Sequence, residues 1–356
     1  MLSRTIFEQT LRQHLEPIAA YLNDPTVTEI LINGPDTIYI ERQGRLFRTD
    51  AKFPSARALM AALRNIGQFV GRGFDEQTPI LEARLPDGSR VQAVLPPIAP
   101  DGPSVSIRRF FTESMTMLSL LESGSVSPDA AQFLDLAVKV KQNIIVAGGT
   151  GSGKTSLLNV LTDFFYDDER VVVIEDSREV QLRKPHVVHL EARPGDAEGR
   201  GDISIRDLFR TTLRMRPDRI VIGEVRGREA LDLIQAMTSG HSGSLATVHA
   251  THTKDALSRL ETLALMSDVD LPLLALRLQI ASAVDLIVQT ERLRDGSRHI
   301  SQIAEVKDYD SKEGYQLVPI FDRYYGSKDA EGKVVSELLF TGVRPRVADL
   351  AEKQGL

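Results

Sequence analysis

The sequence predicts an α/β fold in which a parallel sheet with flanking helices follows a smaller α+β domain. In the second half of the chain, β-branched runs such as residues 171–174 and 220–222 alternate with helical apolar patterns, as they do in parallel α/β sheets. In the first hundred residues the strand signals are short. Two of them flank the turn residues Pro86-Asp87-Gly88, which favour an antiparallel hairpin.

The first domain is expected over residues 1–110 of the 356-residue chain. An amphipathic helix is predicted at residues 56–66, and short strands are predicted at residues 28–32, 38–41, 80–85, 90–95 and 105–108. Residues 111–128 have weak periodicity, and we interpret them as the connection between the domains. The second domain is then expected over residues 129–356.

Composition limits the possible classes of protein. Hydrophobic residues make up 42% and charged residues 26%, which is typical of a soluble globular protein. The absence of cysteine excludes disulfides and thiolate-bound zinc and fits a cytoplasmic protein. No stretch approaches 18 consecutive apolar residues, so we expect any membrane contact to be peripheral or through a partner. The net charge of -6 gives no general electrostatic reason to expect nucleic-acid binding.

The most informative segment is a G-x-x-x-x-G-K-[ST] phosphate-loop motif in the second half of the chain. It consists of Gly148, Gly149, Thr150, Gly151, Ser152, Gly153, Lys154 and Thr155. An apolar strand signal at 144–147 precedes it, and apolar residues at helical spacing follow it. Glycines allow successive backbone N–H groups to surround a polyphosphate at a helix N-terminus. We therefore expect ATP or GTP here, with Lys154 on the β- and γ-phosphates and the Thr155 hydroxyl on Mg²⁺.

Polar residues follow three further strand signals of the second domain. The run 171–174 ends in an acidic segment from Glu175 to Glu179, the run 220–222 leads through a glycine to Glu224, and the run 245–248 ends at His249. Because ligands of open parallel sheets bind outside the carboxyl ends of the strands, these residues are expected to converge on one site.

Each of these residues also has an ordinary structural interpretation. A single acid after a strand is more often a helix cap, and a single histidine is more often a surface or core residue. Beside a phosphate loop the hydrolytic interpretation is favoured, because hydrolysis of a phosphoanhydride needs a cation, a carboxylate that positions water and donors for the developing charge. The small-residue interval from His241 to His249 is interpreted as a phosphate-sensing loop.

Together these motifs resemble those of the secretion ATPase superfamily of type II and type IV systems. The matching segments, which occur in the family's order, are the phosphate loop, Glu175-Asp176-x-x-Glu179, residues 213–219, Gly223-Glu224-Val225-Arg226 and residues 239–250. The resemblance implies a C-terminal RecA-like sheet and a PAS-like N-terminal domain. It further implies a ring-forming ATP hydrolase that uses Mg²⁺, is usually a hexamer, and acts from the cytoplasm on inner-membrane pilus or secretion platform proteins.

The resemblance also assigns roles to single residues. Glu179 matches the glutamate taken as general base, Glu224 matches the Walker B carboxylate near Mg²⁺, and His249 with His241 matches the box that senses the γ-phosphate. Arg90 and Arg108 match the N-terminal arginines that contact the nucleotide. Arginine suits this role because its planar, permanently charged group pairs with two phosphate oxygens at once. For Arg90 a solvated hairpin charge remains the alternative.

Departures from the family pattern favour one branch. A cysteine-free chain cannot form the four-cysteine zinc element of type II secretion and type IVa pilus extension ATPases. The C-terminal segments 303–306, 316–321 and 341–346 resemble those of tight-adherence (Tad) pilus ATPases most closely, so a motor for pilus assembly is the leading hypothesis. A type IV secretion ATPase that exports protein or DNA is the alternative.

Two other classes are less favoured. A RecA-like nucleic-acid motor is disfavoured by the acidic net charge and by the lack of a basic strip with interleaved aromatic residues. A non-catalytic scaffold would need a broken site, and every expected residue is present. The sequence leaves open the direction of transport, the substrate, the ring symmetry, the platform surface and which arginine acts between subunits; the candidates for that arginine are Arg214, Arg216, Arg226 and Arg228.

Overall fold

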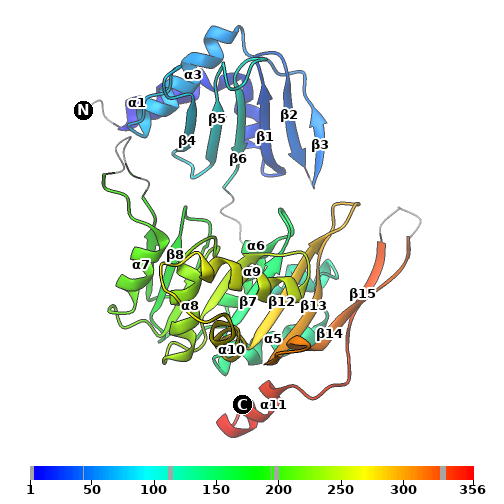
Figure 1. The fold of residues 1–356 in the computed structure, drawn as a ribbon. Helices are drawn as coiled ribbons and strands as arrows, with labels where there is room; N and C mark the ends of the chain where they lie inside the picture. Colours follow the sequence, from blue (N-terminus) through cyan, green and yellow to red (C-terminus); the bar gives the residue numbers. More distant parts are fainter. Residues whose placement is uncertain (1–3, 43, 111–114, 194, 196–199, 329–333) are drawn as a thin grey trace. The chain divides into compact units, whose positions relative to one another are not determined.

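The computed structural model describes residues 4–42, 44–110, 115–193, 195, 200–328 and 334–356. The chain divides into two compact units, Met1–Glu113 and Ser114–Leu356 (Figure 1). No helix among these described residues is long and apolar enough to cross a membrane.

The first unit contains a six-stranded antiparallel sheet in the order β3-β2-β1-β6-β5-β4. Its strands are β1 Val27–Asn33, β2 Ile38–Arg42, β3 Arg45–Arg48, β4 Ile80–Arg84, β5 Arg90–Val94 and β6 Ser104–Arg108. Its helices are α1 Arg4–His14, the single 3₁₀ turn η1 Glu16–Ile18, α2 Ala19–Asn23 and α3 Ala56–Phe69. The fold is therefore the predicted small α+β domain, although the short strand β3 was not predicted.

One face of this sheet is buried because apolar residues alternate along its strands. In β5, Val91 and Ala93 are buried, and in β6, Val105 and Ile107 are buried. They pack in one core with Leu59, Leu63 and Ile66 of α3, whose first turn is capped by the Ser55 side chain. The residues that alternate with these buried positions lie on the other face of the sheet. They include Arg90 at the start of β5 and Arg108 at the end of β6.

The second unit contains a nine-stranded sheet in the order β15-β14-β13-β12-β7-β11-β10-β8-β9. The six strands from β12 to β9 are parallel, and β13, β14 and β15 extend the sheet in antiparallel fashion. The parallel strands are β7 Ile144–Gly148, β8 Val171–Glu175, β9 Val187–Glu191, β10 Arg219–Ile222, β11 Leu245–His249 and β12 Leu286–Arg292. The antiparallel strands are β13 Arg298–Asp310, β14 Gly314–Lys328 and β15 Val334–Phe340.

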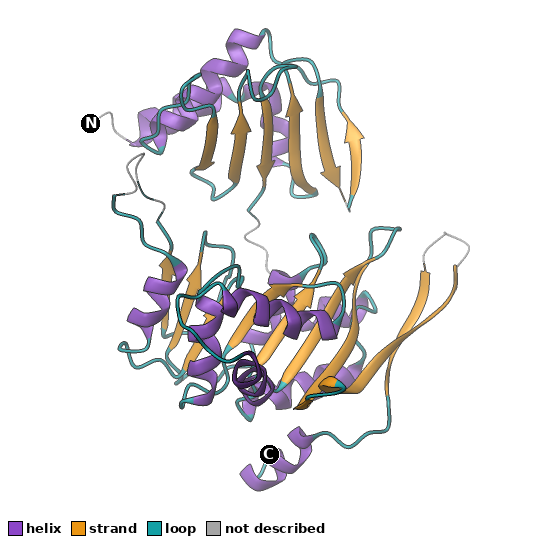
Figure 2. Ribbon diagram, viewed as in Figure 1, coloured by secondary structure: helices purple, strands orange, loops and turns teal. Residues whose placement is uncertain are grey.

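Helices cover both faces of this sheet, as Figure 2 shows. One face packs against α5 Pro128–Lys139, α6 Lys154–Thr162 and α11 Arg346–Gln354. The other packs against α7 Ile205–Thr212, α8 Glu229–Thr238, α9 Thr253–Leu265 and α10 Leu273–Ala283. In β7, Ile144 and Val146 face the first core and Ile145 and Ala147 the second, which explains why this strand is apolar throughout.

The predicted connection 111–128 contains a helix. Residues 111–114 lie outside the described part of the chain, but α4 Met117–Glu122 follows them in the second unit. Thr116 and Ser119 form a reciprocal capping box at its start, and Leu120 is buried. The weak periodicity of residues 111–128 concealed this helix because it is only six residues long.

Candidate nucleotide-hydrolysis site

The phosphate loop joins the end of β7 to the start of α6. The backbone at Gly151 (φ 68°) and Gly153 (φ 96°) is left-handed, a conformation that glycine adopts without steric cost. Lys154 is the first residue of α6, and its Nζ donates hydrogen bonds to the carbonyls of Gly148 (3.0 Å) and Gly149 (2.9 Å). The loop is thus folded around its lysine at a helix N-terminus, which is an anion-binding arrangement.

Two hydroxyl groups support the loop from the side of β12. Thr290 donates to the carbonyl of Ala147 (3.0 Å), Ser152 donates to the carbonyl of Gly149 (2.9 Å), and the two hydroxyl oxygens lie 2.8 Å apart. Both side chains are almost fully buried. Ser152 therefore has a structural role here, and Thr290 is a supporting residue that sequence reasoning missed, although a polar residue in an otherwise apolar strand signal could have indicated it.

Gly148 to alanine is expected to destabilise the protein and to weaken nucleotide binding. A Cβ atom at Gly148 would lie 2.3 Å from Thr290 Oγ1 and 2.6 Å from the Thr290 carbonyl oxygen, so the backbone of β12 would have to move. Overpacking of this kind costs about 1–3 kcal/mol of unfolding free energy. Gly149 to alanine is the matched control because nothing lies within 4 Å of a Cβ there. Denaturant unfolding of both variants measures the difference, and equal stabilities would contradict the prediction.

The acidic segment after β8 places two glutamates in different roles. Glu179 lies beside the phosphate loop, since its Oε2 is 3.4 Å from Thr155 Oγ1. Glu175 is buried, and its Oε1 accepts from the backbone N–H groups of Glu179 and Val180, both at 2.9 Å. Glu175 therefore fixes the turn that presents Glu179. This positioning role was not predicted.

Glu224 follows β10 and lies in a charged cluster. Arg226 Nη2 donates to Glu224 Oε2 (2.6 Å), and Arg226 Nη1 donates to Asp176 Oδ2 (3.1 Å). Burial opposes the charged form of Glu224, but the Arg226 hydrogen bond and the charges of Arg226, Lys154 and His249 outweigh it and hold the pKa of Glu224 below its usual value. The carboxylate is thus charged at neutral pH, as a ligand of a cation must be.

The two histidines lie at opposite ends of β11. His249 ends the strand, is exposed and pairs in register with Gly148 of the phosphate loop. His241 precedes the strand, where its N–H donates to the carbonyl of Ala236 (3.2 Å) and its carbonyl accepts from Ser244 Oγ (2.8 Å). Because a strand rises about 3.3 Å per residue, β11 separates the two by more than about 13 Å. The expectation that both histidines contact the γ-phosphate is therefore corrected, and only His249 is at this edge.

The two predicted N-terminal arginines are neighbours in the first unit. Arg90 of β5 pairs in register with Arg108 of β6, and on its other side with Arg84 of β4. Arg108 also pairs with Glu29 of β1, whose Oε1 accepts from Ser106 Oγ (2.7 Å). Three arginines thus occupy adjacent positions on the face of the sheet that its core does not cover. Like charges directly opposite each other on neighbouring strands are unfavourable.

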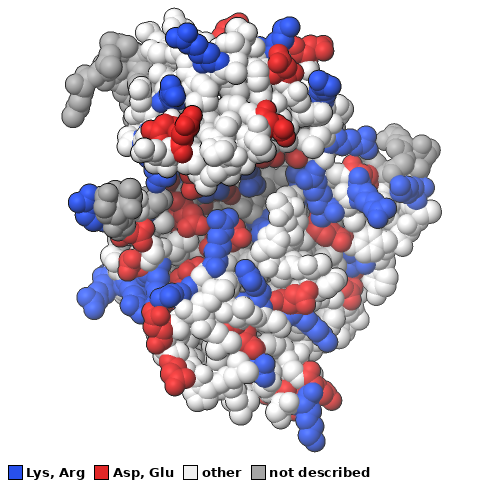
Figure 3. Space-filling model, turned by 45° about the horizontal axis from the view of Figure 1, so that its top comes forward, with Lys and Arg blue, Asp and Glu red and all other residues white. Residues whose placement is uncertain are grey.

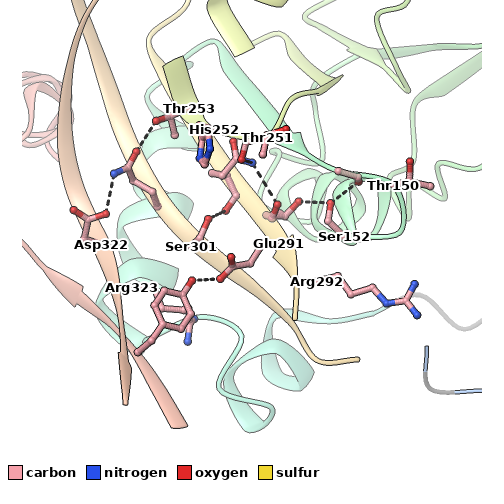
Figure 4. A pocket seen from close by; sticks show the side chains of 15 residues that line it. Thr150, Ser152, Thr251, His252, Thr253, Glu291, Arg292, Ser301, Asp322 and Arg323 are labelled. Carbon is pink, nitrogen blue, oxygen red and sulfur yellow. Dashed lines mark hydrogen bonds between the residues drawn. The ribbon is translucent and has the colours of Figure 1, made fainter. Parts of the chain in front are cut away.

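A pocket of about 480 Å³, lined mostly by residues with polar side chains, adjoins the phosphate loop on the side of β12 to β14 (Figure 4). Its lining includes Gly149, Thr150 and Ser152 of the loop. Gln302 also lines it, accepting from Thr253 Oγ1 (2.6 Å) and donating to Asp322 Oδ1 (2.8 Å). Burial raises the pKa of Glu291 and lowers that of Arg323 to about 10. Glu291 and Arg323 are therefore partly desolvated.

A magnesium site in this chain would need phosphate oxygens of the nucleotide as additional ligands. The described residues contain no group of three or more His, Asp or Glu residues that could hold a metal ion by themselves. Mg²⁺ is commonly bound through one or two protein groups together with substrate phosphates. The Thr155 hydroxyl beside the loop and the charged Glu224 carboxylate fit that donor set.

The chain is similar to known secretion proteins over most of its length. The family described as type II/IV secretion system protein matches residues 12–316. The type IV secretion system protein PtlH of Bordetella pertussis is 36% identical over 306 residues, covering 78% of this chain and 89% of that protein. The conjugal transfer protein TrbB of Rhizobium radiobacter is 31% identical over 299 residues, covering 83% of this chain and 88% of that protein.

A solved structure shares the fold. The X-ray structure of the Legionella pneumophila ATPase DotB superposes with a TM-score of 0.56 at 18% identity, over 86% of this chain and 82% of that one. The expected architecture of an N-terminal domain before a RecA-like core is confirmed by this likeness and by the sheet order of the second unit. With the family match over residues 12–316, the chain belongs to the type II/IV secretion system protein family, the secretion ATPases that its motifs resemble.

Proposed function

We propose that this protein is a motor ATPase that couples Mg²⁺-dependent ATP hydrolysis to pilus assembly or macromolecular export. The observation that carries the proposal is the convergence of Lys154, Thr155, Glu179, Glu224 and His249 at the carboxyl edge of one parallel sheet. These residues include each group that hydrolysis of a phosphoanhydride needs.

In this proposal each residue of the site has its own task. Lys154 leaves the loop carbonyls to neutralise charge on the β- and γ-phosphates, while the loop N–H groups bind the phosphate oxygens. Glu179, held by Glu175, orients the attacking water and accepts its proton. His249 donates to the γ-phosphate. Mg²⁺, held by Thr155 and Glu224, supplies further neutralisation of phosphate charge.

From the resemblance to the family we further propose how the protein assembles and where in the cell it acts. The working form is a homo-hexamer at the cytoplasmic face of the inner membrane, bound to platform proteins of a Tad-type pilus. The segments that resemble Tad ATPases support this branch; residues 303–306 lie in β13, residues 316–321 lie in β14, and residues 341–346 follow β15. Acidic and basic side chains are interspersed on the face shown in Figure 3, which gives no reason to add nucleic acid as a direct partner.

A second candidate function is export by a type IV secretion system. It is favoured by the similarity to a type IV secretion protein and a conjugal transfer protein. Deletion of the gene in its own host separates the two candidates. Loss of surface pili with normal protein and DNA transfer supports pilus assembly, and the reverse result supports export. ATP hydrolysis by the purified protein tests the motor itself, and hydrolysis that requires DNA would instead indicate a nucleic-acid motor.

The double variant Arg90→Ala and Arg108→Ala is expected to keep nucleotide binding through the phosphate loop but to lower turnover. The physical reason is that two guanidinium groups stabilise developing phosphate charge, an effect worth about 10³-fold or more in other phosphoryl transfers. Steady-state hydrolysis with ATP measures the loss. The control is Arg45→Ala with Arg48→Ala, which removes the same charge from exposed positions of β3. Equal turnover in the two double variants would exclude the arginines from the site.

A further inference from the structure

A pair of arginines from the β12–β13 hairpin lies against the phosphate loop. Arg292 ends β12, Arg298 begins β13, and the two residues pair in register. Arg298 Nε donates a 2.8 Å hydrogen bond to the carbonyl of Gly151. A Cβ atom on Gly151 would lie 3.1 Å from Arg292 Nη1. The hairpin therefore places two positive charges beside the loop, neither of which the sequence motifs include.

The hydrogen bond from Arg298 adds a second restraint to the Gly151–Ser152 peptide, whose N–H donates to the carbonyl of Gly149 at 3.4 Å. Gly151 has a left-handed backbone and no side chain to restrict it, so without the bond from Arg298 its carbonyl has more than one accessible direction. A carbonyl that turned toward the phosphates would repel them. Because a bond from a charged donor is stronger than a neutral one, Arg298 keeps this carbonyl engaged and the loop ready for an anion.

The main chain of Arg298 is bound to the segment that precedes α5. Ser125 Oγ donates to the Arg298 carbonyl (2.7 Å), and the Ser125 carbonyl accepts from Ile300 N (3.0 Å) and from Arg323 Nη2 (2.8 Å). Ser125 is buried at 7% exposure and lies between α4 and α5. Arg298 thus contacts the phosphate loop with its side chain. With its main-chain carbonyl it contacts residues 123–127, the entry segment between α4 and α5.

We propose that Arg298 is a positioning residue that sets the conformation of the phosphate loop and links it to the entry segment 123–127 through Ser125. The ligand whose affinity it controls is a nucleoside triphosphate, so the inference rests on the proposed function. The expected consequence is that nucleotide affinity depends on Arg298 and, more weakly, on Ser125, although neither residue belongs to the phosphate-loop motif.

Arg298→Ala is expected to raise the dissociation constant and the KM for ATP by roughly 10- to 100-fold, the effect of losing one charge-assisted hydrogen bond, with a smaller change in kcat. Arg298→Lys retains a donor without the planar group and should recover part of the loss. Arg294→Ala is the matched control, because Arg294 is the exposed arginine in the turn of the same hairpin. Titration with a fluorescent ATP analogue measures affinity, and thermal unfolding shows that each variant is folded.

The link to Ser125 is tested by a double-mutant cycle. Ser125→Ala should raise the dissociation constant by a few-fold alone and by less than that in the Arg298→Ala background, because residues that share one network are not additive. Independent effects would overturn the link, and an unchanged affinity of a folded Arg298→Ala variant would overturn the positioning role. Neither result affects the proposed function, which fails instead if the unaltered protein does not bind and hydrolyse ATP.

Discussion

Replacement of Lys154 by alanine is expected to abolish ATP hydrolysis and to weaken nucleotide binding while the protein stays folded. Lys154 is the only cation of the phosphate-loop motif, and its charge reaches as far as Glu224, whose pKa it helps to lower. Loss of a cation that neutralises phosphate charge costs about 3 kcal/mol or more of transition-state stabilisation, which is at least a 100-fold loss of rate. Release of phosphate from ATP by the purified variant measures it.

The variant also removes the two hydrogen bonds from Lys154 to the carbonyls of Gly148 and Gly149. A small loss of stability in the nucleotide-free protein is therefore expected and has to be separated from the loss of activity. Lys139→Ala is the control, since Lys139 is half-buried at the end of α5 and pairs with Asp135 rather than with the loop. Wild-type turnover by Lys154→Ala would contradict the assignment of this loop as the nucleotide site.

Replacement of Glu179 by glutamine is expected to leave ATP bound but to slow its hydrolysis by about 10²- to 10⁴-fold, the usual effect of losing a general base. An amide keeps the shape and can still accept the contact from Thr155, which is 3.4 Å away, but it cannot take up the proton of the attacking water. Single-turnover hydrolysis measured beside equilibrium binding of the same nucleotide separates chemistry from affinity.

Two neighbouring acids provide comparisons for this variant. Glu191→Gln changes an exposed glutamate at the end of β9, which pairs in register with Glu175, and is expected to hydrolyse ATP normally. Glu224→Gln is expected to impair the magnesium-dependent steps as well as hydrolysis, because it removes a charged carboxylate. If Glu179→Gln turns over at the normal rate, Asp176 becomes the better candidate, since Glu175 is buried and occupied by backbone N–H groups.

The strand signals of the sequence agree with the structure where they are strongest. The runs 171–174 and 220–222 correspond to β8 and β10, and the hairpin at Pro86-Asp87-Gly88 joins β4 to β5. These segments are readable because β-branched runs and turn residues act locally. The short strand β3 and helix α4 were missed because they are only four and six residues long, which is too short for a clear periodic pattern.

Among the site residues, the phosphate loop and the strand ends at Glu179, Glu224 and His249 were predicted, and the structure places them at one edge of the sheet. The pairing of His241 with His249 was not supported by the structure. Closeness along the chain does not imply closeness in space. His241 and His249 are eight positions apart, but the extended strand β11 lies between them and places them at opposite edges of the sheet.

The sequence by itself determined the fold class, which strands of the second domain end in polar residues, and the identity of the phosphate loop. These features depend on local periodicity and on a motif with a fixed backbone chemistry. Only the tertiary structure decided which polar side chains meet. Thr290 and Arg298 support the site from segments that carry no motif, and their contacts exist because the sheet brings β12 and β13 beside the phosphate loop that follows β7. Such contacts depend on the packing of elements that are distant in sequence, which a local pattern does not contain.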